Sequence, residues 1–303
     1  MELSRIGHPR SPKQSEDTNN DAAVTAPGIF AVPTDANCQV TGFVQTVVTR
    51  CGNNKYELAF HGIETVALIA QKVTKSITSN YHIFDALRGG EKVQLTKKAG
   101  HYIGKVRRDK DQPQGCYTLY DSSRDKKQLA AFVYEIPNLV KQLKEGQPPR
   151  KMQAVIPKCS PRIEEEGGNA LLADDGKGNV KGHNNRLMEH LQNGTWQHYN
   201  LVAVQTKPPS FHEGQYRLNF QGRGEFPVLQ YLFLTFHLCD NIHLLITNIL
   251  VLTPSVKNMQ LENQMGEILL QFGKVDDVRF HLDFKAPFTA VSAFAAALAQ
   301  FDL

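Results

Sequence analysis

The sequence predicts a mainly β fold, a sandwich or barrel, closed around a hydrophobic C-terminal helix. The segment Ala286–Phe301 is apolar on nearly every side, whereas a surface helix carries a single apolar stripe. From Pro287, which fits a first helical turn, the segment spans roughly 22 Å as a helix, short of a bilayer core of about 30 Å. The segments before it read as short strands separated by turn signals. The helix is therefore expected to be wrapped by strands.

Composition limits the classes of partner. With 41% hydrophobic and 21% charged residues, the 303-residue chain has enough apolar material for a globular core. Its net charge of +4 permits a phosphate or membrane partner but is small for a nucleic-acid binder, which usually carries a dense Lys/Arg stripe. The polar start lacks the apolar core of a signal peptide. Five scattered cysteines without a C-x-x-C pair predict a reduced, intracellular chain.

The elements are expected in the following order. Residues 1–37 hold little that could pack and are predicted to be a disordered tail, and residues 38–303 form one domain. A short helix is expected at Asn185–Leu191, inside the charged, Gly-rich loop Ser160–Gly194. Runs rich in β-branched and aromatic residues predict strands at Gln39–Thr49, Tyr56–His61, Thr65–Lys75, Tyr102–Arg107, Cys116–Tyr120, Leu129–Tyr134, Met152–Ile156, Tyr199–Gln205, Tyr216–Phe220, Val256–Leu261, Ile268–Phe272 and Val278–Phe284.

Nothing in the sequence supports catalysis. The eleven histidines show no metal-ligand spacing, and no nucleophile elbow, P-loop or dinucleotide motif follows a strand. The acidic runs Glu164–Glu166 and Asp174–Asp175 are expected to be solvated, and Asp276–Asp277 is expected to form a turn rather than a catalytic dyad. Trp196 is assigned to the core. We therefore expect no enzyme activity, no cofactor and no metal.

Short motifs in a fixed order resemble the C-terminal domain of the tubby-like protein family. Three of them precede the terminal AFAAALAQFD: Tyr216–Arg223 (YRLNFQGR), Ser255–Leu261 (SVKNMQL) and Gln271–Gly273 (QFG). Three more lie upstream: Thr78–Tyr81 (TSNY), Tyr102–Arg107 (YIGKVR) and Pro149–Pro157 (PRKMQAVIP). The resemblance covers Gln39 to Leu303. It implies a closed antiparallel β-barrel of about twelve strands around a central hydrophobic helix, in which Asn219 and Asn258 are expected to make structural hydrogen bonds.

One segment departs from the family pattern. In family members a short link joins the GR of NFxGR to SVKN, whereas here residues 224–254 intervene. Removing Gly224–Leu250 leaves only Val251–Pro254, which restores the family spacing, so we interpret this very hydrophobic segment as an unspliced intron in the gene model. A real insertion at the barrel rim is the alternative. A membrane span is disfavoured because polar residues, Asp240 among them, interrupt the run. Family chains also usually continue a few residues past Phe301-Asp302.

The resemblance implies a phosphoinositide-binding site. Family members bind phosphatidylinositol 4,5-bisphosphate, whose vicinal phosphates are neutralised by Lys and Arg held on rigid strands. The matching segments here are Ala70–Tyr81 and Gly104–Arg108. The site residues predicted from them are Lys72, Lys75, Lys105, Arg107 and Arg108.

Strand alternation orients part of this site. A period of two places Lys105 and Arg107 on one face of a strand and turns Tyr102 and Val106 to the other, inward face. The basic run that usually precedes TSNY is depleted, because Gln71, Val73, Thr74 and Ile77 stand where cations are common. Weaker or altered phosphoinositide selectivity is therefore expected.

The expected function is a monomeric, non-enzymatic module that docks reversibly on the cytoplasmic leaflet of the plasma membrane. As the resemblance implies, it would act as an adaptor for membrane-receptor or cilium trafficking, although no helix that engages the intraflagellar transport machinery is evident in residues 1–37. Two alternatives stay open. One is a nucleic-acid-binding transcription regulator in the nucleus. The other is a scramblase-like lipid-handling protein, which would require the terminal helix to leave the barrel.

Overall fold

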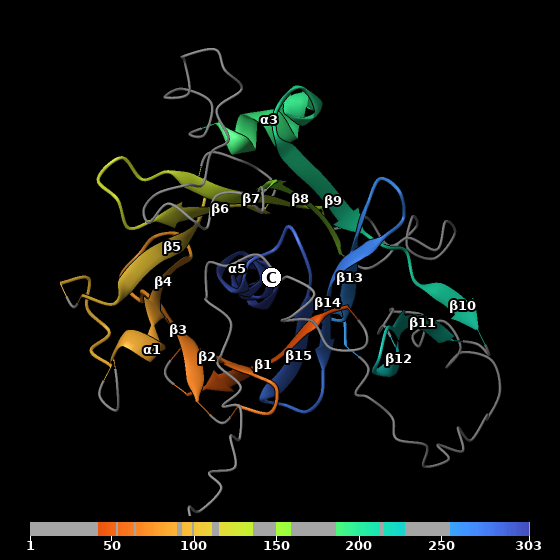
Figure 1. Ribbon diagram of the computed structural model, residues 1–303, viewed down its shortest axis with the longest axis horizontal. Coiled ribbons are helices and arrows are strands. Elements are labelled where there is room, and N and C mark those ends of the chain that lie inside the picture. The colour runs from red at the N-terminus through yellow and green to blue at the C-terminus, as the bar shows by residue number, and fades with distance from the viewer. Residues whose placement is uncertain are drawn as a thin grey trace, which may run out of the picture.

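The chain folds into a closed barrel of twelve antiparallel strands with a helix along its axis (Figure 1). The computed structural model describes residues 42–302 except 53, 64, 90–92, 99, 111–114, 136–149, 159–185, 213–214 and 228–254. The barrel strands are β1 (Val44–Cys51), β2 (Lys55–Phe60), β3 (Val66–Lys72), β4 (Asn80–Asp85), β5 (Tyr102–Arg108), β6 (Gly115–Asp121), β7 (Gln128–Glu135), β8 (Lys151–Pro157), β9 (Leu201–Thr206), β13 (Met259–Asn263), β14 (Ile268–Lys274) and β15 (Arg279–Phe284).

The barrel closes because its first strand pairs with its last. β1 pairs with β2 on one side and with β15 on the other. Within the barrel, each strand is otherwise hydrogen-bonded to its sequence neighbour except where β9 pairs with β13. The stretch between these two strands holds a separate sheet of β10 (Ser210–His212), β11 (Gln215–Phe220) and β12 (Gly224–Pro227). The closed barrel expected from the sequence is thus confirmed.

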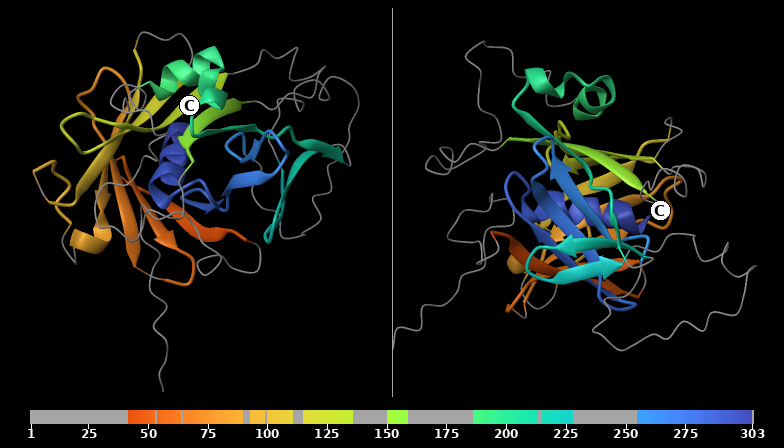
Figure 2. Two further views of the ribbon diagram at one scale, coloured as in Figure 1. Left: turned by 45° about the horizontal axis from the view of Figure 1, so that its top comes forward. Right: turned by 90° about the vertical axis from the view of Figure 1, so that its right-hand side faces the viewer.

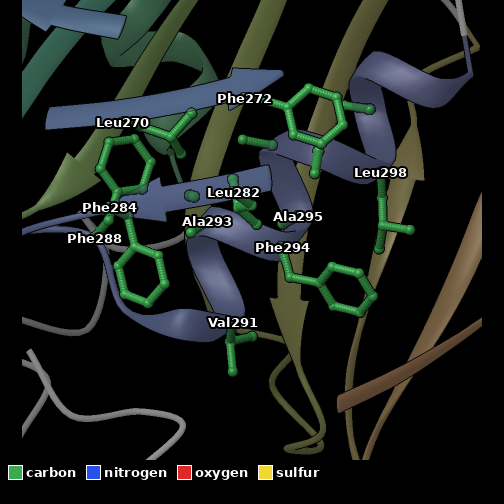
Figure 3. Close-up of a cluster of buried hydrophobic side chains, with 14 of the residues drawn as sticks. Leu270, Phe272, Leu282, Phe284, Phe288, Val291, Ala293, Phe294, Ala295 and Leu298 are labelled. Atoms are coloured by element: carbon green, nitrogen blue, oxygen red, sulfur yellow. The ribbon is translucent and has the colours of Figure 1, made fainter. Parts of the chain in front are cut away.

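The central helix α5 (Ala290–Phe301) fills the barrel, and eleven of its twelve residues are buried. A small barrel is filled by its own side chains, whereas a barrel of twelve strands leaves a wider interior. Alanines keep the helix slender, and Phe294 and Leu298 reach toward the wall, as Figure 3 shows. The cluster around them joins the helix to residues from every barrel strand. This burial is the largest apolar contribution to the fold.

The helix starts later than the sequence predicted. It begins at Ala290, with Thr289 as its N-cap. The Thr289 hydroxyl accepts a hydrogen bond from the Ser292 N–H, and the Ser292 hydroxyl accepts one from the Thr289 N–H. This reciprocal capping box satisfies two of the free amides of the first turn. Pro287 lies before the cap, after a cis peptide bond.

A second, smaller core lies outside the barrel. The helix α3 (Leu187–Asn193), close to the predicted Asn185–Leu191, packs on β7 and β8 with Leu187, Met188 and Leu191 buried. Trp196, in the adjoining turn η4 (Thr195–His198), packs against this outer cluster rather than inside the barrel. A further short helix, α1 (Ala86–Gly89), follows β4.

The small sheet is tied to the barrel wall by a buried polar network. Arg223, just after β11, donates from Nε to Asp283 Oδ2 at 2.7 Å and from Nη2 to Oδ1 at 2.9 Å. Gln271 Nε2 donates to Asp283 and to the Gln221 carbonyl. Because Asp283 is fully buried, this bidentate ion pair satisfies a carboxylate that would otherwise be very costly to bury. The small sheet therefore lies beside β13, β14 and β15 (Figure 2).

The two asparagines differ in how they support the fold. Asn258 is buried, and its Oδ1 accepts a hydrogen bond from the Lys274 N–H at 2.8 Å, which confirms the structural role expected for it. Asn219 is exposed, and the contact at this position is made by its main-chain carbonyl, which accepts from Gln260 Nε2 at 2.8 Å.

Several expectations concern parts of the chain outside the described residues. These are the tail over residues 1–37, the acidic runs at 164–166 and 174–175, and residues 228–250 of the anomalous segment. The first four residues of that segment form β12, paired with β11. Within the described residues, no helix combines the length and apolarity needed to cross a bilayer.

Candidate anion-binding surface

The structure separates the five predicted cations into four environments. Lys72 ends β3 and points to the mouth of the barrel, where the central helix ends. Arg108 ends β5 and lies opposite Tyr117. Lys105 and Arg107 alternate with the buried Val106 and lie on the outer wall. Lys75 is exposed in the loop between β3 and β4.

At the mouth, one buried carboxylate gathers four donors. Asp302, which follows the central helix, accepts from Lys72 Nζ at 2.6 Å, Ser79 Oγ at 2.5 Å, Tyr81 OH at 3.1 Å and Tyr117 OH at 2.7 Å. We call these five residues the mouth cluster. Burial by itself would raise the pKa of Asp302, but the hydrogen bonds from Lys72, Ser79 and Tyr117 hold it below its usual value. The charge of Lys72 is thereby already neutralised.

Further cations stabilise the end of the helix. Arg150 Nη1 and Lys257 Nζ each donate to the Gln300 carbonyl at 3.2 Å. Positive charge is favourable there because the last carbonyls of a helix carry partial negative charge. Burial, followed by repulsion from Arg150 and Arg50, lowers the pKa of Lys257 to about 8. Phe301 closes the mouth, with its ring 4.9 Å from that of Tyr56.

On the outer wall, β4, β5 and β6 bring polar and charged groups side by side. His82 lies opposite Lys105 and Asn80 opposite Arg107, and Lys105 lies opposite Tyr120 on the next strand. The strands can approach closely because residue 104 is glycine: a Cβ there would collide with the Tyr120 carbonyl. The expected sharing of one face by Lys105 and Arg107 is confirmed.

A bulge corrects one expectation on this wall. Tyr102 was expected to face inward with Val106, but the register slips between Ile83 and Phe84, so that Ile103 becomes the extra residue. Ile103 joins the barrel core, and the half-buried Tyr102 packs outside against His82 and Phe84, at 5.6 and 5.7 Å between ring centroids. An added residue in one strand reverses the alternation beyond it.

Two cations that sequence reasoning missed join this wall. Lys97 comes from the loop after α1 and lies 5.8 Å from the Tyr102 ring centroid, and Lys126 comes from the turn after β6. Burial, followed by repulsion from Lys97, Lys126 and Arg107, lowers the pKa of Lys105. We call Lys97, Lys105, Arg107 and Lys126 the wall patch. No spacing signal links residues 97, 105 and 126, since only the folded arrangement of a loop, a strand and a turn brings them together.

The wall patch carries uncompensated charge. No carboxylate in the described part of the chain forms an ion pair with Lys105 or Arg107. Thr78 Oγ1, Asn80 Oδ1 and His82 Nε2, which are two residues apart in the sequence, are buried atoms that lack a hydrogen-bond partner among the described residues. Cations beside unsatisfied polar atoms favour a polyvalent anion that carries hydroxyl groups.

Asp276 and Asp277 form a turn before β15. Asp276 accepts from the Val278 and Arg279 amides at 2.9 and 2.7 Å and from Arg279 Nε at 2.6 Å. Asp277 pairs with Lys274 at 2.9 Å. These bonds match the turn expected at this position. The described residues contain no group of three His, Cys, Asp or Glu that could hold a metal ion.

Comparison with known proteins agrees with this architecture. Over residues 33–303 the chain matches the model of the Tub family. It is 30% identical over 251 residues to human Tubby-related protein 1 and 28% identical over 251 residues to the mouse protein, covering 78% of this chain and 37% of each relative. It is 27% identical over 248 residues to Tubby protein homolog 1 of Caenorhabditis elegans, covering 77% of this chain and 47% of that protein. The chain thus spans less than half the length of these relatives. A family match over most of the chain, together with the helix-filled twelve-stranded barrel, shows that this protein belongs to the Tub family.

Proposed function

We propose that this chain is a non-enzymatic module that binds the headgroup of phosphatidylinositol 4,5-bisphosphate through the wall patch and so docks reversibly on the cytoplasmic leaflet. The observation that carries the proposal is the pair Lys105 and Arg107, which project from rigid, paired strands and face no described carboxylate. Polyvalent phosphate is the anion that such strand-held cations bind best.

The other predicted residues take different parts in this proposal. Lys72 would have to leave Asp302 to bind a phosphate, so we assign it to the mouth cluster. Lys75 lies exposed in the loop before β4 and adds to the attraction of an anionic surface. Ile77, in the same loop, is 89% exposed and suits the apolar layer just below the headgroups. Arg108 lies between the mouth and the wall.

Docking of this kind is reversible, because each cation near an anionic leaflet contributes about 1 kcal/mol. We propose that the protein works as an adaptor which carries membrane-receptor cargo, released when the lipid is hydrolysed. Location at the plasma membrane or cilium follows from this role and is part of the same proposal.

The alternatives have less support. A transcription regulator would need a long basic stripe, whereas the wall patch is compact and the net charge is +4. A scramblase-like protein would need α5 to leave the barrel, which would expose eleven buried, mostly apolar residues and an empty interior.

Vesicle co-sedimentation tests the proposal. The full chain is mixed with phosphatidylcholine vesicles containing either phosphatidylinositol 4,5-bisphosphate or unphosphorylated phosphatidylinositol, together with phosphatidylserine to equalise total charge. Stronger binding to the bisphosphate vesicles is expected. Equal binding to both would refute recognition of the headgroup. A salt-dependent shift with duplex DNA, without any preference among vesicles, would favour the nucleic-acid alternative.

A further inference from the structure

Beside Lys105, the residues His82 and Tyr102 form a group with Lys97 of the wall patch, and the proposed function leaves the role of this group unassigned. His82 on β4 lies directly opposite Lys105 on β5. Lys97 reaches the same place from the loop that follows α1, over the ring of Tyr102. His82 meets that ring edge-on, at 5.6 Å and 79°. Tyr102 therefore contacts both the imidazole and the Lys97 ammonium.

The two lysines are held in place before any ligand arrives. Lys97 Nζ lies 5.8 Å from the Tyr102 centroid and Lys105 Nζ lies 5.6 Å from the Tyr120 centroid. Each ring face attracts the cation above it and limits the positions that the long side chain adopts. Their mutual repulsion is nevertheless uncompensated, since it lowers the pKa of Lys105 after burial has done so. An anion placed between them would remove this repulsion.

The charges of Lys97 and Lys105 also act on His82. Burial, followed by repulsion from Lys97 and Lys105, lowers the pKa of His82 to about 4, so the ring is neutral at pH 7. Its Nε2 is buried and has no partner among the described residues. The groups that face it are Lys105 and Tyr102 from β5, Lys97 from the loop and the uncharged Gln71 from β3. No described carboxylate acts on this ring.

We propose that Lys97 and Lys105 form a second phosphate subsite, next to Arg107, and that a phosphomonoester bound there makes His82 easier to protonate. The inference rests on the proposed function and adds to it the subsite for a second phosphate of the headgroup. Arg107, on the same face as Lys105 and nearer the mouth, holds the first phosphate. Vicinal phosphates on one inositol ring would then bridge the two positions.

The sign of the proton linkage follows from these charges. A dianion on Lys97 and Lys105 cancels the repulsion that they exert on His82, so the pKa of His82 rises in the complex, while burial keeps it from rising fully. Binding then takes up protons between the free and bound pKa values, and affinity gains a contribution as pH falls through that window. The second ionisation of a phosphomonoester, near pH 6, acts in the opposite direction. The two effects are separated by measuring the pKa of His82 directly.

The experiment uses the full chain labelled at histidine and followed by NMR during a pH titration. The titration is run alone, with inositol 1,4,5-trisphosphate, and with an equal concentration of inorganic phosphate. The pKa of His82 is expected to rise by about one unit with the trisphosphate and by much less with inorganic phosphate. The His82→Gln variant identifies the resonance.

Affinity for vesicles containing phosphatidylinositol 4,5-bisphosphate is then compared between Lys97→Ala and Lys98→Ala. These neighbours are both exposed and carry the same charge, but only Lys97 faces Tyr102. We expect Lys97→Ala to weaken binding about fivefold and Lys98→Ala to weaken it less than about twofold. Neither exposed substitution threatens the fold.

Three results would overturn the inference. The first is tight trisphosphate binding with an unchanged His82 pKa, which would place the ligand elsewhere on the protein. The second is an equal loss of affinity in the two lysine variants, and the third is an equal His82 shift with inorganic phosphate. All three leave phosphoinositide binding itself intact. Absence of any trisphosphate or vesicle binding by the unaltered chain would instead defeat the proposed function, and the subsite with it.

Discussion

The mouth cluster and the wall patch use the same kinds of residue for opposite purposes. Lys72 and Lys105 both extend from neighbouring parts of one barrel, and both belong to motifs that suggested lipid binding. At the mouth, Asp302 neutralises Lys72 and ties the end of the central helix to β3 and β4. On the wall, Lys105 and Arg107 meet no described carboxylate. A cation on a strand is thus available to a ligand only where the fold has not already supplied its counter-ion.

The largest effect on binding is expected from charge reversal on the wall. We expect Lys105→Glu with Arg107→Glu to abolish binding to bisphosphate vesicles, because four units of charge change at about 1 kcal/mol each, roughly a thousandfold in affinity. Unfolding should stay close to that of the unaltered chain. The matched control reverses Lys151, which begins β8, and Lys158, which follows it. Vesicle binding that survives the wall reversal would exclude Lys105 and Arg107 as the site.

At the mouth, the opposite outcome is expected. Asp302→Ala should lower the free energy of unfolding by about 3 kcal/mol, since it leaves Lys72 and three hydroxyl groups without their acceptor. Denaturant titration measures this loss. Vesicle affinity per folded molecule should not fall. An unchanged unfolding midpoint would show that Asp302 does not hold the helix.

The variants Lys72→Ala and Lys105→Ala should separate the two roles, stability and vesicle affinity. We expect Lys72→Ala to cost about 1.5 kcal/mol of stability, the scale of one hydrogen bond to a charged group, and to change vesicle affinity less than about twofold. Lys105→Ala should do the reverse. Should the two variants lose affinity equally, mouth and wall would form a single binding site.

The two regions should also respond to acid in different pH ranges. The folded-state pKa of Asp302 lies below its unfolded value of about 3.9, so its contribution is complete above about pH 4 and is lost as pH falls through the folded pKa. The pKa of His82 is about 4 in the fold and about 6.5 unfolded. The unfolded chain therefore binds more protons between these values, and stability declines as pH falls from 6.5 to 4.

Denaturant titrations across pH 3–7 measure both effects. Asp302→Asn should flatten the loss below pH 4. His82→Leu should reduce the loss between pH 6.5 and 4, to which His281 also contributes because burial lowers its pKa to about 4. If each variant altered the other's range, the two assignments would be wrong.

The smallest effect is expected from the anomalous segment. We propose that residues 224–250 are an intron retained in the gene model, and that a chain without them keeps both regions unchanged. Residues on either side of the segment are anchored without it, Arg223 by Asp283 and Asn258 by the Lys274 amide. Equal unfolding midpoint and vesicle affinity in the shortened chain, together with a transcript lacking these codons, are the expected results. A transcript that retains all 27 codons would contradict the hypothesis.

Much of the architecture could be predicted because it depends on local pattern. The predicted strands overlap all but one of the barrel strands. The exception, β4, begins inside the polar TSNY motif and places His82 among hydrophobic residues, which obscures its alternation. The short strands β10 and β12 carry too few residues for a recognisable period. The start of α5 was misplaced because Pro287 fits a first turn as well as it fits the residue before a cap.

The candidate site could be predicted only in part, for a related reason. Lys105 and Arg107 are two residues apart on one strand, so the sequence alone predicts that they share a face. The pairing of Lys72 with Asp302 joins residues 230 positions apart. Lys97, His82 and the reversal of Tyr102 depend on a loop conformation and a bulge, neither of which has a period to detect.

The sequence of this Tub family chain is sufficient to predict that strands enclose a hydrophobic helix, because burial of apolar surface follows patterns that repeat along the chain. The sequence also contains the motifs that identify the family. Which cations are neutralised by a carboxylate and which face solvent depends on the tertiary structure and could not be predicted from the sequence. Charge pairing depends on separations of a few ångströms between groups far apart in sequence, and only barrel closure sets those separations.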